Sequence, residues 1–166
     1  MVWPFLTSFC KDLSDIDLRN VEVTFRSNIL QMIAVTKFAL PHLKRGSSII
    51  NTTSITAFKG SAALIDYSST KGAIVSFTKA LAAQLLPQAI RVNAVAPGPV
   101  MTALQAASRS AENMEGWGVG TPLHGRAGQP AEVGPTYVYL ASSDSNIVTG
   151  EVFHINSPSF CPNFFP

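Results

Sequence analysis

Apolar residues recur at helical spacing over the first quarter of the chain. Between about residues 14 and 45 they follow one another at steps of three, four and seven, which places them on one face of an α-helix. Ser14, with an acidic side chain three residues later at Asp17, predicts a capping box at the start of this helix. Two cations followed by Gly46 predict its end.

A second helix is predicted from about residue 65 to residue 86, where Pro87 ends it. Its apolar side chains go most of the way round the helix, and after Lys71 its only charge is Lys79. A helix that is apolar on several faces has to be covered on several faces. We therefore expect one face to lie on a sheet and another to meet a second copy of the chain in a homo-oligomer.

Three short runs rich in β-branched and apolar residues predict strands, over residues 47–53, 90–96 and 151–155. They alternate with the helices above and with a third helix predicted over residues 131–142. This alternation predicts an α/β fold with a parallel sheet flanked by helices. The long glycine-containing segment 98–129 is expected to be functional, with part of it (102–110) helical.

Composition adds limits to this picture. The chain has 166 residues, enough for one domain, which we expect over residues 13–156 with irregular segments at 1–12 and 157–166. Charged residues make up only 13%, about half the usual share, and hydrophobic residues make up 46%, which argues against disorder. The net charge of +2 is too balanced to indicate binding of nucleic acid or of a membrane surface.

The two cysteines, Cys10 and Cys161, are far apart in the sequence. They form neither a disulfide framework nor a zinc-ligand pattern, so no metal site is expected and both are interpreted as reduced thiols of a cytoplasmic protein. No apolar run reaches the length of a membrane span. A serine hydrolase is disfavoured because the chain has no G-x-S-x-G sequence.

The strongest local signal for chemistry is the pair formed by Tyr67 and Lys71. Residues four apart lie on one face of a helix, so the phenol and the ammonium are expected to be neighbours. A nearby cation lowers the pKa of a tyrosine, which then can exchange a proton with an alcohol or carbonyl oxygen. Ser54, at the end of the first strand, is placed to hold the same oxygen, since ligand sites of parallel sheets form at the carboxyl ends of the strands.

Three segments together resemble the short-chain dehydrogenase/reductase family. They are residues 51–54 (Asn-Thr-Thr-Ser), 67–73 (Tyr-Ser-Ser-Thr-Lys-Gly-Ala) and 91–98 (Arg-Val-Asn-Ala-Val-Ala-Pro-Gly), and the resemblance runs from about Leu13 to Ile155. It implies a Rossmann-like fold and hydride transfer between NAD or NADP and a small carbonyl or alcohol substrate.

The resemblance also implies roles for single residues. Tyr67 would be the general acid/base, Lys71 would lower the pKa of Tyr67 and hold the nicotinamide ribose, and Ser54 would orient the substrate carbonyl. Asn28 would keep a water molecule for a proton relay. The segment that would contact the nicotinamide carboxamide holds Pro97, Gly98, Val100, with its backbone groups, and Thr102, with its hydroxyl.

The segment after Thr102 resembles the substrate-binding lid of the family. Four of its residues suggest an apolar substrate: Ala106, Ala107, Trp117 and Val119. Gly125 and Arg126, with residues 129–133, match the end of that lid and are expected to be structural.

One part of the family pattern is absent from these residues. No glycine precedes Gly46, and Gly116, Gly118 and Gly120 do not have the G-x-G-x-x-G spacing of a turn that holds a cofactor pyrophosphate. We therefore expect an N-terminally truncated domain with about three strands. Two or three missing charge-assisted hydrogen bonds would weaken cofactor binding by about a thousandfold or more.

Two interpretations follow. In the first, the chain is an NAD(P)-dependent oxidoreductase, which the presence of Asn28, Ser54, Tyr67 and Lys71 together supports. In the second, it is a truncated, inactive relative that acts only as a dimerisation module or is the remnant of a longer gene. The missing glycine-rich turn supports this second interpretation.

The strand at residues 47–53 would lack its usual neighbour and would expose an unpaired edge. We predict that the isolated chain self-associates or is poorly soluble, because such an edge is a template for pairing with another strand. Light scattering at micromolar concentration measures this. A monodisperse monomer would contradict the prediction.

Overall fold

The structure is a computed structural model that describes residues 12–103, 105, 114 and 116–157. Several expectations fall outside these residues. They concern the irregular ends, Cys10, Cys161, Ala106, Ala107 and most of the helix expected over 102–110.

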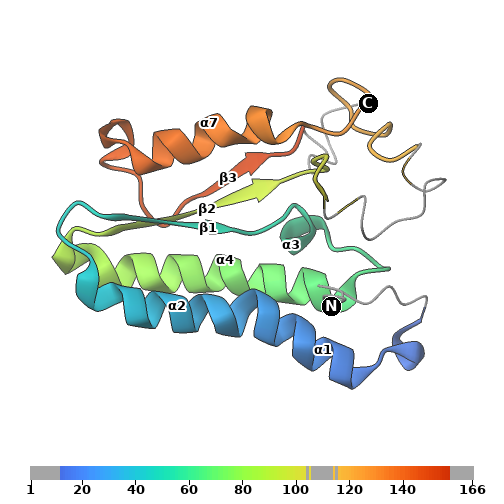
Figure 1. The fold of residues 1–166 in the computed structure, drawn as a ribbon, viewed down its shortest axis with the longest axis horizontal. Coiled ribbons are helices and arrows are strands. Elements are labelled where there is room, and N and C mark those ends of the chain that lie inside the picture. The colour runs from blue at the N-terminus through green and yellow to red at the C-terminus, as the bar shows by residue number, and fades with distance from the viewer. Residues whose placement is uncertain (1–11, 104, 106–113, 115, 158–166) are drawn as a thin grey trace.

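A three-stranded parallel sheet forms the middle layer (Figure 1). Its strands are β1 (Ser48–Thr52), β2 (Arg91–Pro97) and β3 (Val152–Ile155), in the order β1-β2-β3. Ser48 lies opposite Arg91 and Ala94 lies opposite Val152, so the carboxyl ends of all three strands meet at one edge. The predicted α/β fold with a parallel sheet of three strands is confirmed.

Helices cover both faces of the sheet. On one face lie α1 (Leu18–Phe25), the π-helical segment η2 (Arg26–Leu30), α2 (Gln31–Ala39) and α4 (Ile65–Leu85), and on the other lies α7 (Pro130–Ala141). The shorter elements are η1 (Leu13–Asp15), η3 (Leu40–His42), α3 (Thr56–Lys59), η4 (Leu86–Gln88) and η5 (Ser143–Ser145).

The first helix differs from the expectation in two ways. Its N-cap is Asp17, whose side chain accepts a hydrogen bond from the N–H of Arg19 at 2.9 Å, whereas Ser14 lies in the separate turn η1. The predicted Ser14 capping box is therefore wrong. Asp17 has the extended backbone that an N-cap needs, and its carboxylate accepts from an N–H of the first helical turn. The helix is also interrupted by the π-helical segment at residues 26–30.

The core lies on both sides of the central strand. All residues of β2 from Arg91 to Ala96 are buried, which explains its nearly continuous apolar sequence. One cluster of buried side chains joins β2 to α4 and contains Leu81, Ala82, Leu85, Ile90 and Val92. The second joins β2 to α7 and contains Val95, Val133 and Leu140. The expected contact of the 65–86 helix with the sheet is thus confirmed.

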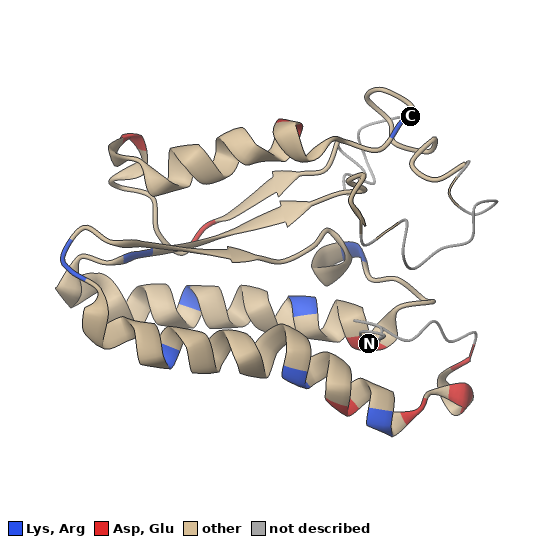
Figure 2. Cartoon of the chain, viewed as in Figure 1, with Lys and Arg blue, Asp and Glu red and all other residues tan. Residues whose placement is uncertain are grey.

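The outer face of α4 is less apolar than its sequence suggests. It exposes Ser76, Lys79 and Gln84 beside the small side chains of Ala80 and Ala83. Figure 2 shows charged residues gathered along α1 and just before it, whereas α2, α4 and α7 carry few. The homo-oligomer expected through this helix stays a prediction. None of the helices among the described residues is both long and apolar enough to cross a membrane.

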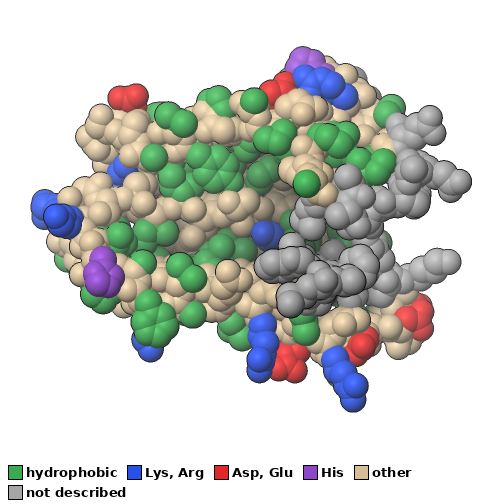
Figure 3. Space-filling view, viewed as in Figure 1, with side chains coloured by type: hydrophobic (Ala, Val, Ile, Leu, Met, Phe, Trp, Pro, Cys, Tyr) green, Lys and Arg blue, Asp and Glu red, His purple; other side chains and the backbone are tan. Residues whose placement is uncertain are grey.

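β1 forms an edge of the described sheet, as expected. It pairs with β2 on one side, and a hollow of about 480 Å³ between β1 and α2 lies on the other, lined by Met32, Val35, Ile49 and Ile50 among others. Figure 3 shows hydrophobic side chains gathered in a band between the α7 layer and the α2 layer. Phe38 of α2 is 70% exposed.

Arg91 ties the end of α7 to β2. Its side chain is only 8% exposed and donates to the carbonyl oxygens of Leu140 at 2.9 Å and Ser142 at 3.1 Å, and to the hydroxyl of Ser145 at 2.7 Å. A guanidinium stabilises the last carbonyls of a helix, which have no partner within the helix. This motif residue is therefore structural.

We predict that Arg91→Met lowers the free energy of unfolding by about 3 kcal/mol, because it removes three charge-assisted hydrogen bonds inside the core. Arg26→Met is the matched control. It breaks only an exposed ion pair with Glu22 and should cost less than about 0.5 kcal/mol. Urea unfolding measures both, and equal losses would contradict the assignment.

Candidate active site

Ser54 stands at the carboxyl edge of the sheet because the chain stays bound to β2 beyond the end of β1. Thr53 N–H donates to the carbonyl of Val95 at 2.8 Å and Ile55 N–H donates to that of Pro97 at 3.1 Å. Ser54 itself is 9% exposed. Its hydroxyl oxygen accepts from the backbone N–H of Thr56 at 3.2 Å and lies 3.1 Å from the Thr56 hydroxyl.

Tyr67 and Lys71 lie in the first turns of α4, on the face that looks toward this edge. The Lys71 ammonium is 5.3 Å from the centre of the Tyr67 ring and donates to the carbonyl of Thr52 at 3.1 Å. The Thr53 hydroxyl in turn donates to the carbonyl of Lys71 at 2.7 Å. The end of β1 therefore fixes the lysine beside the tyrosine, as the i, i+4 spacing predicts.

The electrostatics differ from the expectation. Burial raises the pKa of Tyr67, and a hydrogen bond with the Ser54 hydroxyl lowers that pKa by less than burial raises it. Burial also lowers the pKa of Lys71 to about 8. The predicted lowering of the Tyr67 pKa is thus wrong for this structure, because enclosing the phenol disfavours its anion.

Asn28 is brought close to the same pair by η2. Its side-chain amide donates to the Thr70 hydroxyl at 3.0 Å, and that hydroxyl donates to the carbonyl of Tyr67 at 2.7 Å. π-helical turns inside α-helices are often found at functional sites. The interruption of the first helix therefore falls at the residue that the resemblance assigns to the proton relay.

The segment after β2 is held in one conformation. Gly98 N–H donates to the carbonyl of Ile155 at 2.9 Å, and a Cβ at Gly98 would lie 2.9 Å from the Cα of Asn156, so only glycine fits there. The carbonyl of Pro99 and the N–H of Met101 bond to Gly128 at 2.9 and 2.8 Å. In a parallel bridge of this kind the backbone groups of the residue between them, Val100, point to the other side.

The site residues predicted from the sequence do not share one pocket. Gly98 and Val100 line a pocket of about 280 Å³ together with His154 and Asn156, whereas Asn28 lines the hollow beside β1. Pro97 ends β2, and Thr102 is exposed. Ser54, Tyr67 and Lys71 line neither of these two pockets. The structure nevertheless places Ser54 and Lys71 next to Tyr67 and connects Asn28 to the Tyr67 backbone through the Thr70 hydroxyl. The Val100 segment follows β2 at the same edge of the sheet.

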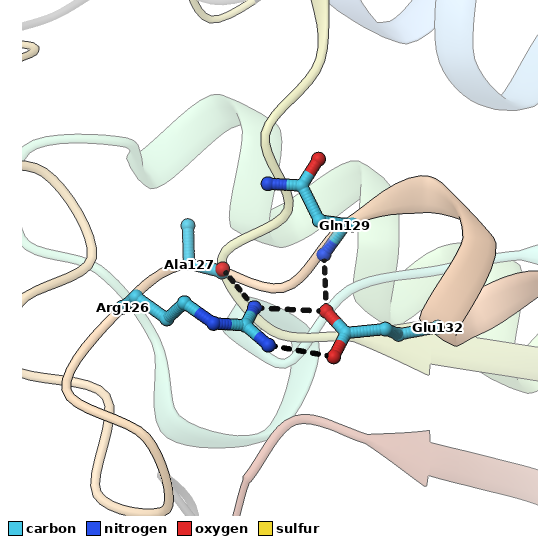
Figure 4. A network of polar contacts seen from close by, with 4 residues as sticks. All are labelled: Arg126, Ala127, Gln129 and Glu132. Carbon is cyan, nitrogen blue, oxygen red and sulfur yellow. Dashed lines mark hydrogen bonds and ion pairs between the residues drawn. The ribbon is translucent and has the colours of Figure 1, made fainter.

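The end of the lid is a structural clamp (Figure 4). The Arg126 guanidinium makes two parallel hydrogen bonds to the Glu132 carboxylate, at 2.9 and 2.8 Å, and Glu132 also accepts from the backbone N–H of Gln129 at 2.7 Å. These bonds lower the pKa of Glu132 to about 2. Gln129 and Glu132 form the capping box that starts α7 at Pro130, and Arg126 holds the Glu132 carboxylate in place, so the structural role predicted for this motif is confirmed.

Two buried residues beside the site escaped the sequence analysis. Thr24 is 1% exposed and Asp66 is 2% exposed, and the Thr24 hydroxyl donates to the Asp66 carboxylate at 2.8 Å. In the sequence, Asp66 could have been noticed as the acidic residue directly before Tyr67 in a mostly apolar helix. Within the described ranges, no group of three or more His, Cys, Asp or Glu side chains is placed to hold a metal ion.

A family model described as enoyl-(acyl carrier protein) reductase matches residues 5–157. The chain belongs to the short-chain dehydrogenase/reductase family. Its Rossmann-like fold agrees with that of a short-chain dehydrogenase/reductase from Brucella melitensis, termed a glucose/ribitol dehydrogenase. That structure superposes with a TM-score of 0.81 at 31% identity, over 93% of this chain and 62% of the other.

Curated relatives extend the likeness to sequence. The chain is 59% identical over 133 residues to the uncharacterized oxidoreductase YhxC of Bacillus subtilis, which is 80% of this chain and 46% of the relative. It is 51% identical over 145 residues to the chloroplastic NADPH-dependent aldehyde reductase 1 of Arabidopsis thaliana, which is 87% of this chain and 50% of the relative. The chain thus spans about half the length of the curated relatives it matches.

The low pKa of Lys71 gives a prediction about stability. Below pH 8 the folded chain holds a partly buried ammonium, whereas between pH 8 and pH 10.5 this lysine is neutral when folded and charged when unfolded. The unfolded chain then binds more protons, so the wild type gains stability as the pH rises. We therefore expect Lys71→Met to stabilise the chain relative to wild type most at pH 7 and less at pH 10.

Urea unfolding at the two pH values measures this difference. Lys79→Met, at an exposed position of the same helix, is the matched control. A relative stability of Lys71→Met that stays constant or rises between pH 7 and pH 10 would contradict the burial of the ammonium.

Proposed function

We propose that this chain provides the catalytic residues of an NAD(P)-dependent oxidoreductase that interconverts a small carbonyl compound and its alcohol. One observation carries the proposal. The half-buried Tyr67 side chain lies at the carboxyl edge of a parallel sheet, near enough to the Ser54 hydroxyl for that hydroxyl to lower the pKa of the phenol, and the Lys71 ammonium lies 5.3 Å from the phenol ring. The proposed acid Tyr67, the orienting hydroxyl of Ser54 and the Lys71 cation therefore lie together at this edge of the sheet.

In the direction of reduction, Tyr67 donates its proton to the substrate oxygen while Ser54 orients that oxygen. The raised pKa keeps the phenol protonated near neutral pH, which suits a proton donor. The Lys71 ammonium stabilises the phenolate that is left, and a proton returns through water held near Asn28. In oxidation the phenolate takes the proton from the alcohol. A bound nicotinamide supplies or takes the hydride.

The residues after β2 fit the nicotinamide end of NAD or NADP. The backbone groups of Val100 point away from their bridge to Gly128, and Gly98 leaves no side chain over the strand ends. Pro97 and Thr102 flank this segment, and Lys71 would hold the ribose hydroxyls. The matching relative of Arabidopsis thaliana is named for NADPH, which supports a nicotinamide cofactor.

The names of two matching proteins support a class of substrate. An aldehyde or a polyol is the kind of molecule for which two matching proteins are named. The apolar character expected from the lid stays a prediction: Val119 is 62% exposed, and Ala106 and Ala107 lie outside the described residues. We also propose a homo-oligomer through α4, since its outer face combines small side chains with a single cation.

Tyr67→Phe should abolish turnover and leave the fold intact, because it removes only the hydroxyl that carries the proton. Oxidation of NADPH with a small aldehyde, followed at 340 nm, measures turnover. The matched control is Tyr139→Phe on α7, whose ring packs edge-on against Phe153 on the other face of the sheet. Undiminished activity of Tyr67→Phe would remove Tyr67 from the mechanism.

A cofactor titration separates the oxidoreductase from the dimerisation module. The purified chain is titrated with NADPH and with NADH, and nicotinamide fluorescence is followed. Saturable binding supports the proposal, and the nicotinamide-side groups alone predict an affinity about a thousandfold below that of a complete site. No binding at millimolar cofactor would favour the module.

A further inference from the structure

Two hydrogen bonds cross between the first helix and α4 in matching positions. The Thr24 hydroxyl donates to the Asp66 carboxylate at 2.8 Å, and the Asn28 amide donates to the Thr70 hydroxyl at 3.0 Å. Thr24 and Asn28 are four residues apart, as are Asp66 and Thr70. The two bonds therefore form successive rungs, one helical turn apart, between helices that run in the same direction.

The rung at Thr24 is buried in a way that stability alone does not explain. Thr24, Asp66 and Thr70 are 1%, 2% and 0% exposed. Enclosing a carboxylate costs free energy that a hydrogen bond only partly offsets, and a pair of well-packed apolar side chains at such a place is often as stable or more so. A polar pair retained there favours one alignment of the two helices, since a slide by one turn would break the bond between the Thr24 hydroxyl and the Asp66 carboxylate.

The same two rungs enclose the backbone of the proposed acid. The second oxygen of the Asp66 carboxylate accepts from the N–H of Tyr67 at 2.7 Å, and the Thr70 hydroxyl donates to the carbonyl of Tyr67 at 2.7 Å. The N–H of Tyr67 is in the first turn of α4, where no intrahelical acceptor exists. Asp66 thus joins the start of α4, the tyrosine and the first helix in one cluster.

The rung at Thr24 also lies directly before the π-helical segment that carries Asn28. A π turn widens the helix and shifts the register of everything after it. A fixed point just before that turn is therefore needed to determine where Asn28 comes to lie on α4.

We propose that Thr24 and Asp66 are positioning residues: their hydrogen bond sets the register of the first helix on α4 and so holds Asn28 beside the Tyr67–Lys71 pair. The use made of Asn28 rests on the proposed function. Its placement does not, and it can be measured without cofactor or substrate.

The test follows the side-chain amide of Asn28 by NMR in the full chain labelled with ¹⁵N-asparagine, its signals being assigned through Asn28→Ser. Thr24→Val removes the hydroxyl and keeps the branched shape. We expect it to shift these signals and to speed their exchange with solvent about fivefold or more, the effect of losing one buried hydrogen bond. Thr24→Ser, which restores the hydroxyl, should return the exchange to near the wild-type rate.

Thr78→Val is the matched control. Thr78 is a fully buried threonine of α4, three turns beyond Tyr67, and its hydroxyl accepts from the side-chain amide of Asn51 at 2.9 Å. It should leave the Asn28 signals unchanged. Unaltered Asn28 exchange in a folded Thr24→Val variant, or equal effects of Thr24→Val and Thr78→Val, would overturn the proposal.

Asp66→Leu is a second test that applies even if Thr24→Val does not fold. A leucine side chain has nearly the size of the aspartate and no polar atom, so it loses the bonds to both Tyr67 N–H and the Thr24 hydroxyl. The Asn28 exchange should again rise. Where the preparation turns over substrate, kcat should fall about tenfold or more with KM changed less than twofold, since misplacement by about an ångström affects the transition state more than binding. An unchanged exchange rate in Asp66→Leu contradicts the proposal whether or not turnover is found.

Discussion

Parallel pairing of β1 with β2 is the constraint on which the site depends. It brings the ends of both strands to one edge and keeps the chain bound to β2 through Thr53 and Ile55 after β1 has ended. Ser54 is held between those two bonds. The carbonyl of Thr52 then fixes Lys71, and the Thr53 hydroxyl fixes the backbone of α4 at the same residue. A chain that paired β1 in another register would separate the serine from the tyrosine.

The sequence was informative where short-range geometry decides the outcome. The i, i+4 spacing of Tyr67 and Lys71 places them together on any α-helix, and the buried strand β2 follows from its continuous apolar residues. It was uninformative where several acceptors compete. The N-cap is Asp17 and not Ser14 because local backbone conformation decides between them, and the π-helical turn at Asn28 leaves no mark in the hydrophobic pattern. The raised pKa of Tyr67 depends on burial by parts of the chain far away in sequence.

Within the described residues, β1 lies at one edge of the sheet. β1 offers an unpaired edge beside a hollow lined by α2, and the matching relatives are about twice as long as this chain. We propose that the groups at the strand ends hold a nicotinamide and the oxygen of a substrate, whereas the 166 residues contain no glycine-rich sequence of the kind that holds a pyrophosphate. We therefore propose that this chain holds the reacting groups, and we predict weak affinity for the adenine end of the cofactor.

Saturation-transfer difference NMR of NADPH with the chain tests this claim most directly. Protein protons are saturated, and the transfer to the nicotinamide ring protons is compared with the transfer to the adenine protons of the same molecule. We expect stronger saturation of the nicotinamide ring, because the proposed site holds that end of the cofactor with Val100, Tyr67 and Lys71. Equal or stronger saturation of adenine, or none of the nicotinamide, would contradict it.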